Sequence, residues 1–141
     1  MFFLSVLYYV IFVTVRQWTG GYHADSYLKC NLTFAGITFF TLGMTKLSCM
    51  REVYNPTIHG LLLVTVLLIV WKYAPVENLN KPLTEEQKKR NHRAAFIAVI
   101  VLEALSCGLY VFSSEVSALA AYTLFSIAVL ILISKKQKRR E

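Results

Sequence analysis

The chain has 141 residues, of which 56% are hydrophobic and 16% charged, and 15 basic against 8 acidic residues give it a net charge of +7. A soluble domain carries roughly a quarter charged residues, so this chain has too few to cover a water-facing surface. Its basic residues stand in blocks between long apolar runs, which excludes a disordered chain and an ordinary soluble enzyme and argues against a nucleic-acid partner. The length allows one domain, 1–141, and we expect a small polytopic membrane protein.

Cofactor and disulfide chemistry are not indicated by the cysteines and histidines. The three cysteines, at positions 30, 49 and 107, form no CxxC pair and leave one thiol over if two join. His59 and His92 lie at spacings that do not fit a zinc site. We therefore expect no metal and no other cofactor.

Five apolar segments predict an all-α integral membrane bundle. A helix needs about 20 residues, at about 1.5 Å each, to cross roughly 30 Å of hydrocarbon. Four segments are long enough with modest help from their flanks, whereas the first is short. Because the first lacks a basic leader and a cleavage site, it is a poor signal peptide, and we interpret it as the tail of a longer span or as a short span helped by its flank. The segments are 1–15, 31–50, 58–74, 94–114 and 116–134.

The distribution of Lys and Arg predicts the orientation, because basic residues concentrate in cytoplasmic loops. The C-terminal run 135–140 contains five basic residues. Counting back through the spans places the basic loop 75–93 and the polar segment 16–30 on the same side. We expect a multi-pass protein of the plasma membrane with these three segments in the cytoplasm and the connections 51–57 and 113–117 outside.

The polar segment 16–30 contains the residue types that thiol catalysis needs. Cys30 and His23 lie seven residues apart, and an imidazole beside a thiol can take its proton and later protonate a leaving amine. Gly21, next to another glycine, permits a tight turn. The alternative is a small apolar cysteine at a membrane interface, which is common.

The spacing also constrains how the two side chains meet. On one straight helix they would share a face but stand about 10.5 Å apart along the axis, which is beyond hydrogen-bond reach. We therefore expect a break near 20–25 and a new helix that starts at about Ser26 and carries Cys30 in its second turn. Its positive end would favour the thiolate modestly.

The pattern Arg16-x6-His23-x6-Cys30, with Gly21 two residues before the histidine, resembles the accessory gene regulator protein B family of quorum-sensing membrane peptidases. The run APVENLNKP at 74–82, followed by a basic stretch and two more spans, is similar to the corresponding family loop.

The resemblance implies a cysteine endopeptidase that cleaves a propeptide on the C-terminal side of its signal core. Cys30 would be the nucleophile that forms an acyl-enzyme thioester, with His23 as its base. An internal cysteine of the propeptide would then attack the thioester and release a thiolactone. Gly21 would shape the backbone, and Arg16 would hold a headgroup, a propeptide carboxylate or the oxyanion, unless it is only a positive-inside anchor. The third catalytic group stays open among Asp25, Ser26 and Asn31.

The implied partners are an AgrD-like propeptide with an internal cysteine and an acidic tail, the lipid bilayer, and a second copy of the chain in a homodimer. Five cations of the basic loop would recruit the acidic tail, unless they serve only as a topology signal. These cations are Lys81, Lys88, Lys89, Arg90 and Arg93. The rival function is a non-catalytic membrane subunit or a small peptide transporter, in which 16–30 is a structured loop. A thiolate-dependent lipid acyltransferase is disfavoured because the chain has no acyl-carrier motif.

The sequence also predicts the surroundings of four residues inside the spans. Glu103, near the middle of the fourth segment, should be protonated, paired or turned toward other helices, or should line a peptide path. Lys46 should extend to the interface or reach toward Glu103. Cys49 and Cys107 are interpreted as core filler.

Overall fold

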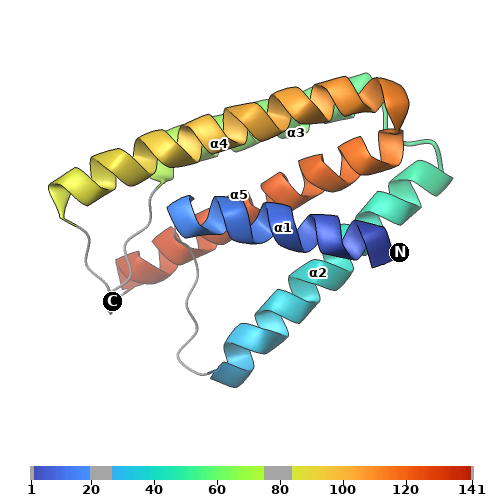
Figure 1. The fold of residues 1–141 in the computed structure, drawn as a ribbon. Helices are drawn as coiled ribbons and strands as arrows, with labels where there is room; N and C mark the ends of the chain where they lie inside the picture. The colour runs from blue at the N-terminus through green and yellow to red at the C-terminus, as the bar shows by residue number, and fades with distance from the viewer. Residues whose placement is uncertain (1, 20–26, 75–83, 141) are drawn as a thin grey trace.

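The computed structural model describes residues 2–19, 27–74 and 84–140, and these ranges contain five α-helices and no strand. All five helices are long and apolar enough to cross a membrane. Consecutive helices run in opposite directions (Figure 1). The expected all-helical membrane bundle is confirmed. The helices are α1 (Phe2–Thr19), α2 (Tyr27–Met50), α3 (Pro56–Tyr73), α4 (Glu85–Phe112) and α5 (Ser114–Arg140).

The first helix is longer than expected. The apolar run ends at Val15, but α1 continues to Thr19, and both of these side chains are fully buried. The Arg16 guanidinium lies 5.4 Å from the centre of the Phe12 ring, so the first cation of the sequence packs back over the helix without ending it. The segment thereby reaches a length that can span a bilayer.

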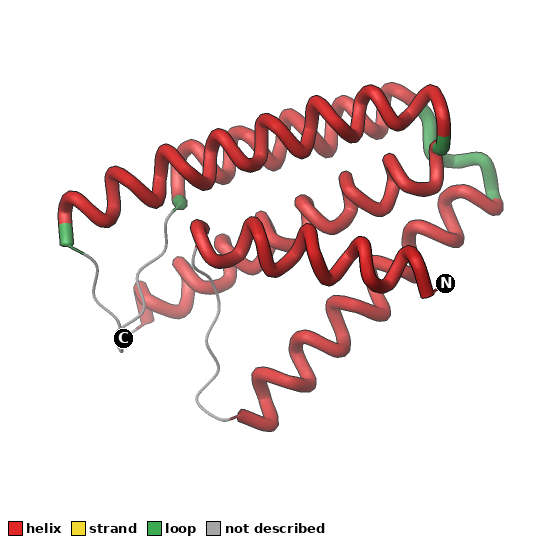
Figure 2. Tube along the Cα trace, viewed as in Figure 1, coloured by secondary structure: helices red, strands yellow, loops and turns green. Residues whose placement is uncertain are grey.

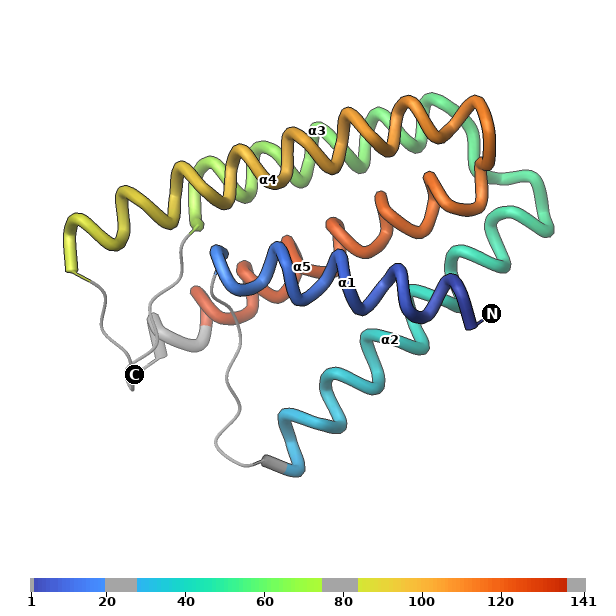
Figure 3. Tube along the Cα trace, in the orientation of Figure 1, coloured from blue at the N-terminus to red at the C-terminus, as the bar shows by residue number. Residues whose placement is uncertain are grey.

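The last helix lies at the centre of the bundle. α5 contacts each of the other four helices, and it is the most buried of the five. Figure 3 shows α5 crossing α1, and the α3–α4 pair packs alongside it. Small side chains allow this close approach, since buried alanines and serines let helix backbones come together in membrane proteins. The small buried residues of α5 are Ser117, Ala118, Ala120, Ala121, Ser126 and Ala128.

Helix α2 is joined to α5 by polar contacts. The Ser126 hydroxyl donates to the Tyr122 carbonyl oxygen at 2.9 Å, so its Oγ is free to accept from the Thr41 hydroxyl, also at 2.9 Å. Tyr122 lies one turn from Ser126, and Ser48 lies two turns from Thr41. The Ser48 hydroxyl and the Tyr122 phenol are 2.8 Å apart. Hydrogen bonds between helices in a membrane contribute about 0.6 kcal/mol each on average. These hydrogen bonds add to the packing of α2, which contacts mainly α5.

The connection from α2 to α3 contains a left-handed residue. The Val53 amide donates to the Ser48 carbonyl oxygen and the Glu52 amide to that of Cys49, which is the hydrogen-bond pattern of a Schellman motif. Glu52 has φ 54° at the position where glycine is the usual residue. The next helix starts at once, because the Asn55 side chain accepts from the Ile58 amide and Pro56 is suited to the first helical position.

Helix α4 begins well before residue 94, where the expected apolar segment 94–114 starts. Thr84 and Gln87 form a reciprocal capping box, in which each side chain accepts from the other residue's backbone amide. The helix therefore begins at Glu85, and residues 85–93, which were expected to belong to the basic loop 75–93, are helical. Residues 75–83 lie outside the described ranges. Figure 2 shows the short connections at the other end, where Ser113 alone separates α4 from α5.

Candidate functional site

The expected catalytic segment spans the end of α1 and the start of α2. Arg16 lies in the last turn of α1 and Cys30 in the first turns of α2. Both are partly buried. Gly21 and His23 lie outside the described residues, so the distance between the imidazole and the thiol stays a prediction.

The described start of α2 lies close to the expected helix start, whereas the expected break at 20–25 lies outside the described residues. The helix begins at Tyr27, one residue after the expected start, and Cys30 is its fourth residue. The positive end of a helix dipole stabilises an anion within the first turn, and Cys30 lies at the edge of that region. Of the candidate third groups, Asn31 is an exposed residue of α2, whereas Asp25 and Ser26 lie outside the described ranges.

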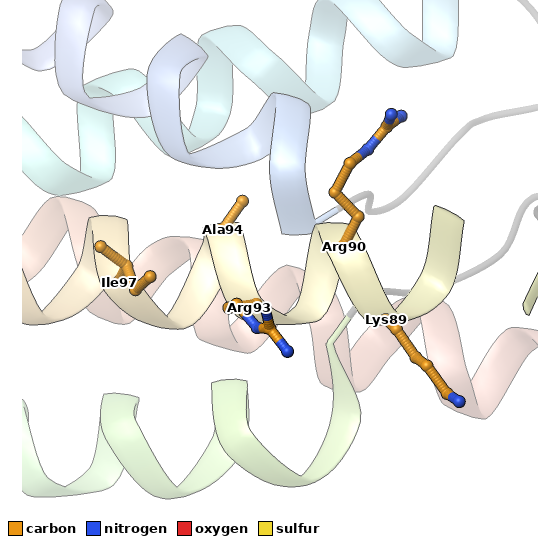
Figure 4. A pocket seen from close by; sticks show the side chains of 5 residues that line it. All are labelled: Lys89, Arg90, Arg93, Ala94 and Ile97. Atoms are coloured by element: carbon orange, nitrogen blue, oxygen red, sulfur yellow. The ribbon is translucent and has the colours of Figure 1, made fainter. Parts of the chain in front are cut away.

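The cations of the expected loop divide into two sets on the first turns of α4. Lys89, Arg90 and Arg93 are exposed and line an open pocket together with Ala94 and Ile97. Figure 4 shows the three cationic groups fanning out near the start of the helix, with the two apolar side chains further along it.

Lys88 does not belong to that pocket. Its ammonium lies 3.3 Å from the Glu85 carboxylate, and Lys88 is not among the residues that line the pocket. Lys81 lies outside the described residues. Of the five cations expected to recruit substrate, three therefore share one surface.

The basic pocket lies at the same end of the bundle as Cys30, because α2 and α4 both start there (Figure 1). This end is fixed by two contacts between helices. The His92 Nδ1–H group donates to the Ala74 carbonyl oxygen at 2.8 Å, which ties α4 to the end of α3. The Lys135 ammonium of α5 lies 4.9 Å from the centre of the Tyr73 ring, within the range of a cation–π contact.

Glu103 and Lys46, the two charged residues expected inside the spans, have different surroundings. Glu103 turns inward and is 6% exposed, and its Oε1 atom has no hydrogen-bond partner among the described residues. Lys46 forms an ion pair with Glu115 at the start of α5, with 2.5 Å between nitrogen and oxygen, and so does not pair with Glu103.

The expectation that Cys107 is core filler is wrong. Cys107 is exposed, and its Sγ atom lies 3.6 Å from the Nε2 atom of His59. The two residues are 48 positions apart in the sequence, so no local spacing could have paired them. Cys49 is partly buried at the end of α2.

No group of three or more His, Cys, Asp or Glu side chains within the described ranges is arranged to hold a metal ion.

The described part of the chain is an all-helical, multi-pass membrane protein with a thiol and a basic pocket at one end. The sequence model of accessory gene regulator B matches residues 1–134. The chain belongs to this family, which acts in accessory gene regulator quorum sensing and is linked to a propeptide substrate. No match was found among the curated proteins or among the solved structures.

Proposed function

We propose that the chain is a cysteine endopeptidase that cleaves a quorum-sensing propeptide and closes its signal core into a thiolactone. The observation that carries the proposal is the position of Cys30 in the first turns of α2, directly after the segment that contains His23. This position lies inside the matched range 1–134. A thiol at the positive end of a helix, with a histidine close in sequence, has the parts of an activated nucleophile.

In the proposed reaction, His23 takes the proton of the Cys30 thiol, and the thiolate attacks the carbonyl carbon at the C-terminal side of the signal core. The peptide bond breaks, His23 protonates the leaving amine, and the signal core remains on Cys30 as a thioester. The internal cysteine of the propeptide then attacks this thioester and displaces Cys30. Both steps consume and release protons in equal number, and the second exchanges one thioester for another.

The basic pocket gives the substrate's acidic tail a place to bind. Lys89, Arg90 and Arg93 are exposed at the end of the bundle where Cys30 lies. Opposite charges attract over roughly 10 Å at 0.1 M salt, so these cations would concentrate an acidic peptide near the thiol. Arg16, at the end of α1, would contact a headgroup, a propeptide carboxylate or the oxyanion.

The proposed orientation places this end of the bundle in the cytoplasm. The alternating directions of the helices support it, because they put the basic starts of α2 and α4 and the basic end of α5 on one side. Cysteines introduced for Glu86 and Glu52 in a chain without its own cysteines would report the two sides. A membrane-impermeant maleimide added to intact cells should label position 52 and spare position 86. Labelling of position 86 from outside would overturn the orientation.

The test of the reaction is mass spectrometry of the chain co-expressed with its propeptide in membranes. The unchanged chain should carry an adduct on Cys30 that hydroxylamine removes, and the medium or membrane should contain the thiolactone. Cys30→Ala should lose both, and His23→Gln should lower the rate by about 10²-fold or more, as expected for loss of a general base. Cys49→Ala is the matched control and should process normally.

Two outcomes would contradict the proposal. Normal processing by the Cys30→Ala chain would exclude this thiol as the nucleophile. If the chain is required for signal output but the propeptide is never cut in its presence, the rival function, a non-catalytic subunit or peptide transporter, would hold. Cross-linking in membranes tests the proposed homodimer in the same preparations.

A further inference from the structure

A cysteine–histidine contact lies at the opposite end of the bundle from Cys30. His59 is in the first turn of α3, and Cys107 is near the end of α4 (Figure 1). The His59 Nε2 atom and the Cys107 Sγ atom are 3.6 Å apart, within hydrogen-bond range for sulfur. His59 is 6% exposed, whereas Cys107 is exposed. A buried base thus contacts a thiol on the outer surface of the bundle.

The imidazole ring is held in one orientation by its neighbours. Its Nδ1 atom forms a hydrogen bond with the Tyr54 hydroxyl and lies 3.5 Å from the Ser117 Oγ atom. The rings of Tyr54 and Tyr110 pack against it, with centres 5.7 Å and 5.5 Å from the imidazole centre. These contacts come from the α2–α3 connection, α4 and α5, so three separate parts of the bundle fix the ring.

The contacts at Nδ1 fit either tautomer of the neutral imidazole, because the Tyr54 hydroxyl can donate to this atom or accept from it. The Ser117 hydroxyl lies 2.9 Å from the Ser106 carbonyl oxygen, and a carbonyl oxygen can only accept. Ser117 therefore donates there, and its Oγ atom faces Nδ1 of His59 as an acceptor. When Nδ1 carries the proton, the lone pair of Nε2 points toward Cys107. This is the tautomer that can take a proton from the thiol.

The surroundings keep this arrangement neutral. Burial raises the pKa of the Tyr54 phenol above its ordinary value, so Tyr54 stays uncharged and serves as a hydrogen-bonding partner of Nδ1. Tyr110, from α4, is the other titratable side chain against the ring. The Lys46–Glu115 ion pair and Cys49 lie at the same end of the bundle.

We propose that Cys107 and His59 form a second thiol–imidazole site, which accepts acyl groups from hydrophobic peptide thioesters. His59 Nε2 takes the thiol proton, and the Cys107 sulfur bonds to the acyl carbon. The carbon–sulfur bond of the thioester breaks, and the proton passes from His59 to the departing thiolate. One thioester is consumed and one is formed, so the step needs no oxidant or other reactant. Tyr54 and Ser117 are positioning residues.

The acyl donor is assigned by chemistry and by the surface around the thiol. A thioester carbonyl is more electrophilic than an amide and its leaving group is a thiol, so one base suffices for the exchange. Val111, one turn beyond Cys107 on the same face of α4, is 83% exposed, and this apolar surface suits a hydrophobic acyl group. A thiolactone made at Cys30 would be one such thioester, but the reactivity of Cys107 does not depend on that chemistry.

The test uses two chains in lipid nanodiscs, each with a single cysteine. The first retains Cys107 and carries Cys30→Ala and Cys49→Ala, and the second retains Cys49 and carries Cys30→Ala and Cys107→Ala. Cys49 is a reference thiol at the same end of the bundle, and no imidazole contacts it among the described residues. Because Cys49 is partly buried and Cys107 is exposed, the decisive comparison is the Cys107 chain with and without His59→Gln. Each chain is incubated with a linear acetyl-leucyl thioester or a five-residue thiolactone peptide, and the S-acyl adduct is followed by intact mass. Since both chains lack Cys30, the outcome is independent of the proposed peptidase.

We expect the Cys107 chain to form the adduct at least about tenfold faster than the Cys49 chain, since a positioned base contributes roughly 10²–10⁴-fold. His59→Gln should remove this advantage in the Cys107 chain and leave the Cys49 chain unchanged. The rate of the Cys107 chain should also reach its plateau at a lower pH than that of N-acetylcysteine, a comparison that requires no change at His59. Reaction with the linear thioester alone would support the site and exclude the thiolactone as its acyl source. Equal rates in the Cys107 chain with and without His59→Gln and a pH profile like that of N-acetylcysteine, or no reaction with either thioester, would overturn the proposal.

Discussion

Removing the three exposed cations of the basic pocket should weaken propeptide binding without stopping the reaction. The variant is Lys89→Gln, Arg90→Gln and Arg93→Gln together. An exposed ion pair contributes about 0.2–1 kcal/mol, so three pairs with an acidic tail sum to about 0.6–3 kcal/mol. At about 1.4 kcal/mol per factor of ten, KM should rise between about threefold and about 140-fold. The turnover rate should change little, because none of the three cations takes part in the proposed proton transfers or bond changes.

The assay is the rate of propeptide cleavage in vesicles of uncharged lipid, measured against propeptide and salt concentration. Salt shortens the range of electrostatic attraction from about 10 Å at 0.1 M to about 3 Å at 1 M, so KM of the unchanged chain should rise with salt toward that of the variant. Lys88→Gln is the control, because this lysine lies outside the pocket and pairs with Glu85. An unchanged KM in the triple variant, with its membrane orientation retained, would refute recruitment and leave these residues as a topology signal.

Three further predictions concern the stability of the bundle, measured by thermal unfolding in detergent. Glu103→Leu should stabilise by about 1–3 kcal/mol, because it removes a buried carboxyl oxygen that has no partner among the described residues, and a lower midpoint would show that the carboxyl is satisfied. Glu52→Gly should stabilise by up to about 1 kcal/mol, because glycine adopts a positive φ without strain; Glu52→Ala, which keeps the Cβ atom, should not. Lys46→Glu and Glu115→Lys should each destabilise and should compensate when combined, and additive effects would show that the pair contributes nothing.

The spans could be predicted from the sequence because bilayer thickness fixes the length of an apolar run. The ends of the helices depend on side-chain contacts that hydropathy ignores. Arg16 looks like the end of a span, yet it packs over Phe12 and α1 continues. The start of α4 did have a local signal, since Thr84 and Gln87 stand at the spacing of a capping box. Hydropathy marks only the apolar part of this helix, which begins nine residues after Glu85.

The candidate site was predictable where its residues are close in sequence. The segment from Arg16 to Cys30 could be recognised because its histidine and cysteine occur within one short polar break. His59 and Cys107 could not be paired in this way, because their contact depends on how α3 and α4 rotate and slide against α5. That register is set by packing among all the helices, which no spacing within one segment records.

The central position of α5 has a consequence for how the protein is made. Synthesis proceeds from the N-terminus, so α1 to α4 leave the ribosome before the helix that all four contact. Each is apolar enough to enter the bilayer alone, but α1 and α2 make few contacts with each other. Before α5 inserts, α4 can pack against α1 and α3, but α2 lacks its main partner, so complete assembly waits for α5. A ribosome that stalls between Phe112 and Ser114 would leave a membrane-inserted intermediate whose helices lack their common partner.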